Sequence, residues 1–237
     1  MTLYIIIGRT HRFRDSRVVI GKFKDLSREL QDVYVAEKIR RGVRRREQDV
    51  YVFRVVENDP LAWFFVSFDI KAPKKPGYEY TVIMREMFFN LCARVDRSTY
   101  ICPESVDVKP ILAKAGVEAN VETHYVVPND DRAAAHLKEA IVSGVKISES
   151  EAPKSPLSYI KSTLIDMLKS VREADRRANR VRAYAKQLLE RARGVLELVK
   201  RCKAKFTAIG LDPTQIELEI EELVEKLEAT IKEKWRD

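Results

Sequence analysis

Glycine, histidine and cysteine are scarce in this sequence, which limits the chemistry that it can support. Its 237 residues include 8 glycines, 3 histidines and 3 cysteines. Without a glycine-rich loop, the chain has no phosphate cradle of the kind found in nucleotide-binding proteins. His11, His124 and His136 stand at no spacing from a serine or cysteine that is typical of a hydrolase. We therefore identify no catalytic residue and expect no cofactor.

Long apolar runs and paired cysteines are also missing. No run approaches the ~18 consecutive apolar residues of a membrane-spanning helix, and residues 1–9 lack the layout of a signal peptide. Cys92, Cys102 and Cys202 have no metal-ligand spacing and indicate no disulfide framework. We expect a cytoplasmic protein that binds neither a membrane nor a metal ion.

The sequence is instead rich in charge and in helical periodicity. Asp, Glu, Lys and Arg make up 34% of the residues, a composition typical of thermophile, archaeal-like proteins. Over Leu157–Phe206, apolar or small residues recur at alternating steps of three and four, as at the a and d positions of a coiled coil. The pattern predicts one continuous helix of roughly 75 Å, at ~1.5 Å per residue. Ser155 and Pro156 stand where its N-cap and first residue are expected.

A second helix is predicted to fold back on the first. Gly210, Asp212 and Pro213 form a turn signal, and an apolar stripe follows over Thr214–Trp235. This helix is about half as long as the first, so the antiparallel hairpin leaves the seam over Leu157–Ala178 uncovered. Either the rest of the chain or a second copy must cover this seam. We favour a second copy, which predicts a homodimer formed through the coiled coil.

Positive charge is concentrated on the first of these helices. The chain carries a net charge of +8, and residues 154–205 hold fifteen Lys or Arg against five Asp or Glu. Residues 206–237 hold four against nine, so the second helix is acidic. Pairing between the two helices leaves an excess of positive charge, which favours an anionic partner.

Two arginine clusters are the candidate nucleic-acid-binding residues. Guanidinium groups match the geometry of phosphates, although a solvated helix flank or turn can carry the same residues. Phe13, between two arginines, is a candidate for stacking on an unpaired base. The first cluster comprises Arg40, Arg41, Arg44, Arg45 and Arg46. The second comprises Arg172, Arg176, Arg177, Arg180 and Arg182.

The N-terminal 143 residues predict an α+β fold in two parts. Residues 1–59 indicate a β-rich unit, in which residues 24–47 fit a helix followed by a loop better than a strand. Residues 60–143 alternate strand and helix, which is typical of a ferredoxin-like α/β sandwich, and residues 144–155 form a linker to the helical hairpin of 156–237. The expected strands are Leu3–Ile7, Val18–Phe23, Val50–Val56, Trp63–Ile70, Ser98–Cys102 and Ala119–Val127. The expected helices are Tyr80–Val95, Val106–Ala115 and Asp130–Val142.

A short resemblance accompanies this pattern. The strand Trp63–Ile70, with the sequence Trp-Phe-Phe-Val-Ser-Phe-Asp-Ile, is followed by a helix and by the run Ser-Thr-Tyr-Ile-Cys-Pro from Ser98. Residues 61–127 thereby resemble the ferredoxin-like CRISPR-associated adaptation protein and the C-terminal domain of PaaX-type repressors. The resemblance implies a dimeric module associated with nucleic acid. Because some adaptation proteins are metal-dependent nucleases, it also makes Asp69 a candidate metal ligand.

Three functions follow from these observations. The first is a dimeric nucleic-acid-binding protein, for DNA or RNA, whose arginine clusters bind the phosphate backbone. The second is a structural or assembly protein whose coiled coil mediates protein–protein contacts. The third is a metal-dependent nuclease that uses Asp69, although a lone carboxylate is a poor metal site.

Overall fold

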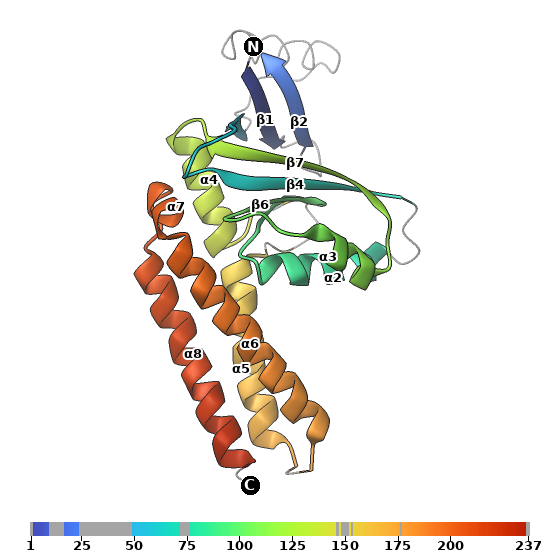
Figure 1. Cartoon of the computed structure of the whole chain (residues 1–237), viewed down its shortest axis with the longest axis vertical. Coiled ribbons are helices and arrows are strands. Elements are labelled where there is room, and N and C mark those ends of the chain that lie inside the picture. Colours follow the sequence, from blue (N-terminus) through green and yellow to red (C-terminus); the bar gives the residue numbers. More distant parts are fainter. Residues whose placement is uncertain are drawn as a thin grey trace.

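The computed structural model shows a mixed α+β fold built on one antiparallel sheet (Figure 1). It describes residues 2–9, 17–23, 49–71, 76–145, 147, 152, 154–175 and 177–235. The sheet has seven strands in the order β2-β1-β3-β7-β4-β6-β5, and every neighbouring pair is antiparallel. The strands are β1 (Thr2–Arg9), β2 (Arg17–Phe23), β3 (Asp49–Val55), β4 (Trp63–Ile70), β5 (Ala93–Asp96), β6 (Thr99–Cys102) and β7 (Ala119–Pro128). All six expected strands are confirmed, while residues 24–47 lie outside the described residues.

Helices follow and cover this sheet. The helices are α2 (Pro76–Phe88), α3 (Val108–Ala115), α4 (Asp131–Val142), α5 (Pro156–Glu173), α6 (Asn179–Arg201), α7 (Lys203–Ala208) and α8 (Pro213–Lys234). The predicted N-cap of α5 is confirmed, because Ser155 accepts a hydrogen bond from the Ser158 amide. Helix α4 is capped in the same way by Asp130, which accepts one from the Ala133 amide. The turn signal before α8 is confirmed as well: Asp212 caps the helix and Pro213 is its first residue.

Strand β4 lies between two hydrophobic cores, which explains its largely apolar sequence. Phe64, Val66 and Phe68 pack with α2 and α3 on one face of the sheet. Trp63 and Phe65 pack on the other face with α4 and the C-terminal helices. A strand that is buried on both faces reads as a continuous apolar run rather than an alternating one. The sequence therefore identified β4 as a central strand, and it pairs with β6 and β7.

The expected helix Tyr80–Val95 is wrong at its C-terminal end. Helix α2 ends at Phe88, and the chain turns at Leu91, whose φ of 52° lies in the left-handed region. Asn90 stabilises this turn by donating its side-chain amide to the Glu86 carbonyl. The chain then enters β5, a strand that the periodicity had merged into the helix. Its apolar residues, such as Val95, are buried against the sheet core.

The single 75 Å helix predicted over Leu157–Phe206 is also wrong. Helix α5 ends at Glu173, Ala174 has an extended backbone (ψ 146°), and α6 begins at Asn179. The Asp175 carboxylate accepts a hydrogen bond from the Arg177 amide, the local bond by which Asp favours turns over helix. Ala174 and Ala178 keep the seven-residue spacing through this break, so periodicity alone could not reveal it.

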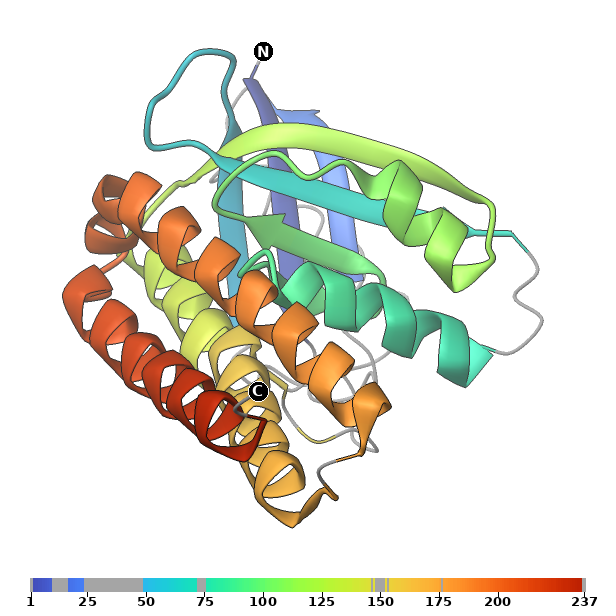
Figure 2. The ribbon, with the colours of Figure 1, turned by 60° about the horizontal axis from the view of Figure 1, so that its bottom comes forward.

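The C-terminal helices therefore form a three-helix bundle, not a long hairpin. Helices α5, α6 and α8 lie side by side, and α4 lies between α5 and the sheet (Figures 1 and 2). Every seam residue from Leu157 to Val171 is buried within the single chain. The reason for expecting a second copy is thus removed, and the homodimer stays a prediction.

The helical bundle shares its core with the sheet. Phe206 of α7 is fully buried and packs edge-on against Trp63 of β4, with ring centroids 5.6 Å apart. Tyr159 of α5 packs against Phe88 and Phe89 at the end of α2. The bundle is consequently anchored at the end near the sheet, and its other end, with the α5–α6 connection, points away from the sheet (Figure 1).

The expectation that the cysteines form no disulfide is wrong, because Cys92 and Cys102 are bonded to each other. The two residues are ten positions apart, and the β5–β6 hairpin brings their Cα atoms to 4.0 Å. The spacing carries no recognisable motif, and only the missed strand β5 makes the two cysteines neighbours. Cys202 is a buried free thiol.

Candidate nucleic-acid interface

The second arginine cluster lies around the α5–α6 connection, at the end of the bundle that is far from the sheet (Figure 1). Arg172 is in the last turn of α5, Arg177 is in the connection, and Arg180 and Arg182 are at the start of α6. The expectation that they share one helix face is wrong, because the helix breaks between them. We call Arg172, Arg177, Arg180 and Arg182 the basic tip. Arg176 and the whole first cluster, Arg40, Arg41, Arg44, Arg45 and Arg46, lie outside the described residues.

The guanidinium groups of Arg172, Arg177 and Arg180 are exposed and form no ion pair with any residue that the structure describes. From Arg191 to Lys203, the basic residues of the second half of α6 and its continuation are paired with carboxylates. Arg191 bonds Glu86, Arg193 bonds Glu190 and Glu228, and Arg201 bonds Glu104, at distances of 2.9–3.1 Å. Lys200 and Lys203 bond Glu197 and Glu217. Positive charge is thus neutralised at one end of α6 and left available at the other.

The N-terminus of α6 adds to the positive potential of the tip. Its N-cap, Ala178, forms no side-chain cap, and its first turn contains no acidic residue. Amides at a helix N-terminus carry a partial positive charge that favours anions and disfavours cations, typically by ~0.3–1 kcal/mol per charge. Arg177 and Arg180 therefore stand where they oppose the helix dipole. A bound phosphate would satisfy both the amides and the guanidinium groups.

Arg172 differs from these two residues, because it also has a structural role. It stands in the last turn of α5, where a cation complements the negative end of the helix dipole. Its carbonyl oxygen accepts a 2.9 Å hydrogen bond from Lys234 Nζ, which fastens the end of α8 to the end of α5. Arg177 and Arg180 are consequently the better probes of a binding role.

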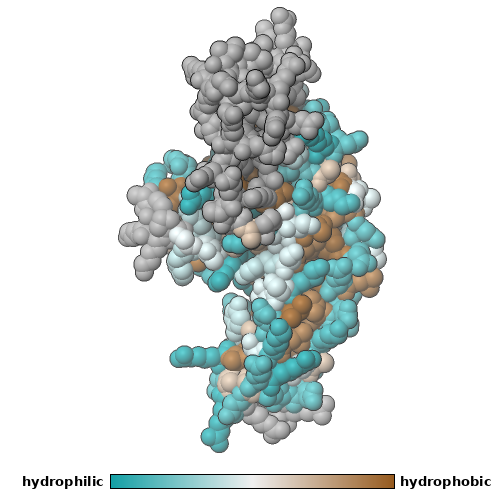
Figure 3. Space-filling view, turned by 180° about the vertical axis from the view of Figure 1, so that it is seen from behind, coloured by the Kyte–Doolittle hydropathy of each residue, from teal (hydrophilic) through white to brown (hydrophobic). Residues whose placement is uncertain are grey.

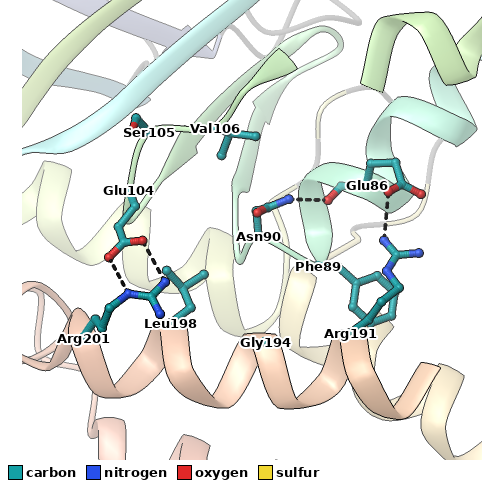
Figure 4. Close-up of a pocket in the computed structure, with 10 residues that line it drawn as sticks. All are labelled: Glu86, Phe89, Asn90, Glu104, Ser105, Val106, Arg191, Gly194, Leu198 and Arg201. Atoms are coloured by element: carbon teal, nitrogen blue, oxygen red, sulfur yellow. Dashed lines mark hydrogen bonds and ion pairs between the residues drawn. The ribbon is translucent and has the colours of Figure 1, made fainter. Parts of the chain in front are cut away.

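A groove lies at the opposite end of α6, between this helix, the end of α2 and the segment that follows β6 (Figure 4). Its volume is about 280 Å³. Gly194 stands at its centre, where an added Cβ atom would meet no other atom within 4 Å. An ion pair closes each side: Arg191 with Glu86 and Arg201 with Glu104. The residues that line the groove are Glu86, Phe89, Asn90, Glu104, Ser105, Val106, Arg191, Gly194, Leu198 and Arg201.

The charged groups of this groove satisfy one another. The Arg191 guanidinium lies 3.8 Å from the centre of the Phe89 ring and bonds Glu86, whose other oxygen accepts from Lys114 at 2.6 Å. The two-pronged hydrogen bond from Arg201 lowers the pKa of the Glu104 carboxyl below its usual value. Burial raises the pKa of the adjacent Cys202 thiol to about 11, so this cysteine stays protonated at neutral pH. The groove therefore offers no free charge to an anion.

The remaining candidate residues are dispersed. Asp69 is exposed at the end of β4, opposite Asn120 of β7, and no group of three potential metal ligands occurs in the parts of the chain that the structure covers. His124 bonds Glu122 at 3.0 Å, and His136 is buried with its ring stacked 3.5 Å from that of Tyr51. His11 and Phe13 lie outside the described residues.

Sequence reasoning missed the groove and its two ion pairs. The available signal was Gly194, a glycine in the interior of a strongly periodic helix, where it costs roughly 1 kcal/mol relative to alanine. It also missed Tyr184, a half-exposed aromatic residue one turn from Arg180. The sequence did contain a signal for Tyr184: an aromatic side chain at a helix position other than the a and d positions that form the apolar seam.

The comparisons with known proteins give no further guide to the site. The chain matches no protein-family model, no curated protein and no solved structure. Among the described helices, none is long and apolar enough to cross a lipid bilayer.

Proposed function

We propose that this protein binds nucleic acid through the basic tip of its helical bundle. The observation that supports this most is the contrast along α6, where arginines near the groove are paired with carboxylates and Arg177 and Arg180 are not. Unpaired arginines beside an uncapped helix N-terminus are unfavourable for the free protein, and phosphate groups would relieve that cost. The first cluster, Arg40–Arg46, would supply further phosphate contacts.

The sheet supports the same proposal at the level of the fold. From β4 to β7 the elements follow the order strand, helix, strand, strand, helix, strand, which is the ferredoxin-like pattern. In the sheet these strands lie in the order β7-β4-β6-β5, so the first strand is central and the fourth lies beside it. We infer a ferredoxin-like unit that β1, β2 and β3 extend on the β7 side. Fold alone does not assign a function, so the proposal rests on the tip.

Binding of fluorescent oligonucleotides, measured by anisotropy over a series of salt concentrations, tests the proposal. Single-stranded DNA, single-stranded RNA and duplex DNA each serve as ligand. We expect affinity to fall steeply with salt, because neutralised phosphates release their counterions. The variant R177A/R180A should bind about tenfold or more weakly at low salt, and its salt slope should decrease by about 2.

The matched control is K200A/K226A, which removes two positive charges that already have carboxylate partners, Glu197 and Glu222. This variant should bind nearly as well as the wild type. Equal losses in both double variants would show that net charge, not the tip, drives binding. If none of the three nucleic acids bound at low salt, the proposal would be wrong.

An assembly role is the second candidate, and one observation favours it. Ile165 of α5 and Leu218 of α8 are large apolar side chains that are 41% and 58% exposed. Seen from behind, hydrophobic surface also runs along the helical part of the molecule between hydrophilic residues (Figure 3). A dimer or a complex would bury such apolar side chains, and the molar mass in solution, measured by light scattering, tests this role directly.

A further inference from the structure

Tyr184 stands on the exposed side of α6, one helical turn beyond Arg180. Its side chain is 52% exposed. Residues four apart on a helix are neighbours on its surface, so the ring of Tyr184 and the guanidinium of Arg180 share one face. Arg177 lies just before α6, in the connection from α5.

The fold does not require an aromatic residue at this position. The buried side of this part of α6 is formed by Ala185, Leu188 and Leu189, which are at most 6% exposed. Within the described parts of the chain, Tyr184 stacks on no other ring and forms no cation–π pair. A ring that faces solvent beside the unpaired Arg180 is available to a ligand.

The other exposed tyrosines stand in different surroundings. Tyr78, 64% exposed, follows Gly77 in the first turn of α2 and precedes Glu79. Tyr125, 44% exposed, lies on β7 with its ring 5.7 Å from that of Phe64. Of these three tyrosines, Tyr184 is the one with an unpaired arginine, Arg180, one turn away on the same helix.

The face that carries Tyr184 ends at the groove. Arg191 lies two turns beyond Tyr184, and its guanidinium is held between Glu86 and the ring of Phe89. The arginines of the groove are already bonded to carboxylates, Arg191 to Glu86 and Arg201 to Glu104, so they are not available to phosphates. A nucleic-acid strand that contacts Tyr184 would therefore extend toward the tip and not toward the sheet.

We propose that the tip binds single-stranded nucleic acid, with an unpaired base stacked on Tyr184 and the adjoining phosphates bound by Arg180 and Arg177. The inference rests on the proposed function and specifies its ligand. Aromatic side chains beside cationic residues are the usual platform for single strands, because every base has a flat face. In a duplex these faces are covered by the neighbouring base pairs, so the ring would have nothing to stack on. Tyr184 is fixed on a long helix, which positions the ring before the ligand arrives.

The test compares Y184A, Y184F and the wild type with oligo(dT), oligo(U) and a DNA duplex of the same length, by anisotropy at fixed salt. We expect the wild type to prefer the single strands. Y184A should bind them about tenfold more weakly, with duplex binding unchanged, while Y184F should behave as the wild type because it keeps the ring. Comparing the affinities for oligo(dT) and oligo(U) shows whether the stacked base belongs to DNA or to RNA.

The matched control is Y78A, which removes an exposed tyrosine on α2, a helix that carries none of the tip arginines. This variant should bind as the wild type does. Equal weakening by Y184A and Y184F would indicate a hydroxyl–phosphate contact and would overturn the stacking role. Equal loss of duplex and single-strand binding in Y184A would overturn it as well. In both cases the proposed function would still stand if wild-type binding depended on salt and R177A/R180A weakened it. If the wild type bound none of the ligands, both the proposed function and the stacking role would be wrong.

Discussion

The two ends of α6 carry similar numbers of basic residues but satisfy them in opposite ways. Near the sheet, Arg191, Arg193 and Arg201 each bond a carboxylate, two of them on other elements of the fold. At the tip, Arg177 and Arg180 have no such partner among the described residues, and they oppose the helix dipole. Basic residues at the anchored end hold the bundle to the sheet. Arg177 and Arg180 form no such bond among the described residues, which is why we assign binding to that end.

The largest expected effect concerns the anchored end. Phe206 is fully buried and joins the bundle to Trp63 of β4. F206A should lower the free energy of unfolding by about 3–5 kcal/mol, because a large side chain leaves a cavity in a shared core. Denaturant unfolding followed by fluorescence and by circular dichroism should give one coincident transition.

The control is I165A on α5, where the side chain is 41% exposed and the change should stay within about 1 kcal/mol. Two separate unfolding transitions in F206A would mean that the bundle and the sheet do not share a core. A loss of unfolding free energy no larger than that of I165A would mean the same.

A smaller effect of opposite sign is expected in the groove. G194A should raise the stability by about 0.5–1 kcal/mol, because alanine favours the helix and its Cβ would meet open space. Thermal unfolding measures this change. G116A is the contrasting variant, since Gly116 has a φ of +71° and alanine is strained there. A loss of stability in G194A would show that the groove is narrower than the structure indicates.

The smallest effect concerns the ion pair of Glu104 with Arg201. The pKa of Glu104 is lowered in the folded protein, chiefly by the hydrogen bond from Arg201. Its contribution is therefore present above the pKa of the unfolded chain and is lost as the pH falls through the lower, folded pKa. E104Q should cost less than about 1 kcal/mol at neutral pH, as partly exposed pairs do. The free energy of unfolding of E104Q should also fall less between pH 7 and acid pH than that of the wild type. An equal fall in the two proteins would contradict this.

The sequence predicted those features that depend on local pattern. The apolar run of β4, the N-cap at Ser155, the turn signal at Asp212 and Pro213, and the apolar seam of α5 were each visible as residue types at a fixed spacing. They were confirmed because local chemistry and tertiary packing favour the same structure there.

The features that the sequence did not predict depend on contacts between distant segments. Ala174 and Ala178 preserve the heptad spacing across a break that Asp175 and the packing of α5 on α6 create. The strand β5 was hidden in a helical pattern, and the disulfide of Cys92 with Cys102 was hidden with it. For the candidate site, Arg177 and Arg180 were identified from the sequence, but their lack of ion-pair partners among the described residues was not. That property follows from where Glu86, Glu104 and Glu228 lie in the fold.

Site-resolved amide chemical shifts, recorded by NMR as oligo(dT) is added to the intact protein, test the central claim most directly. The account predicts perturbations at Arg172, at Arg177 and through the first turns of α6 to Tyr184, with Gly194 and Arg201 unaffected. They should fade as salt is raised, because the contacts are to phosphates. Perturbations confined to the groove residues, with none at the tip, would contradict it.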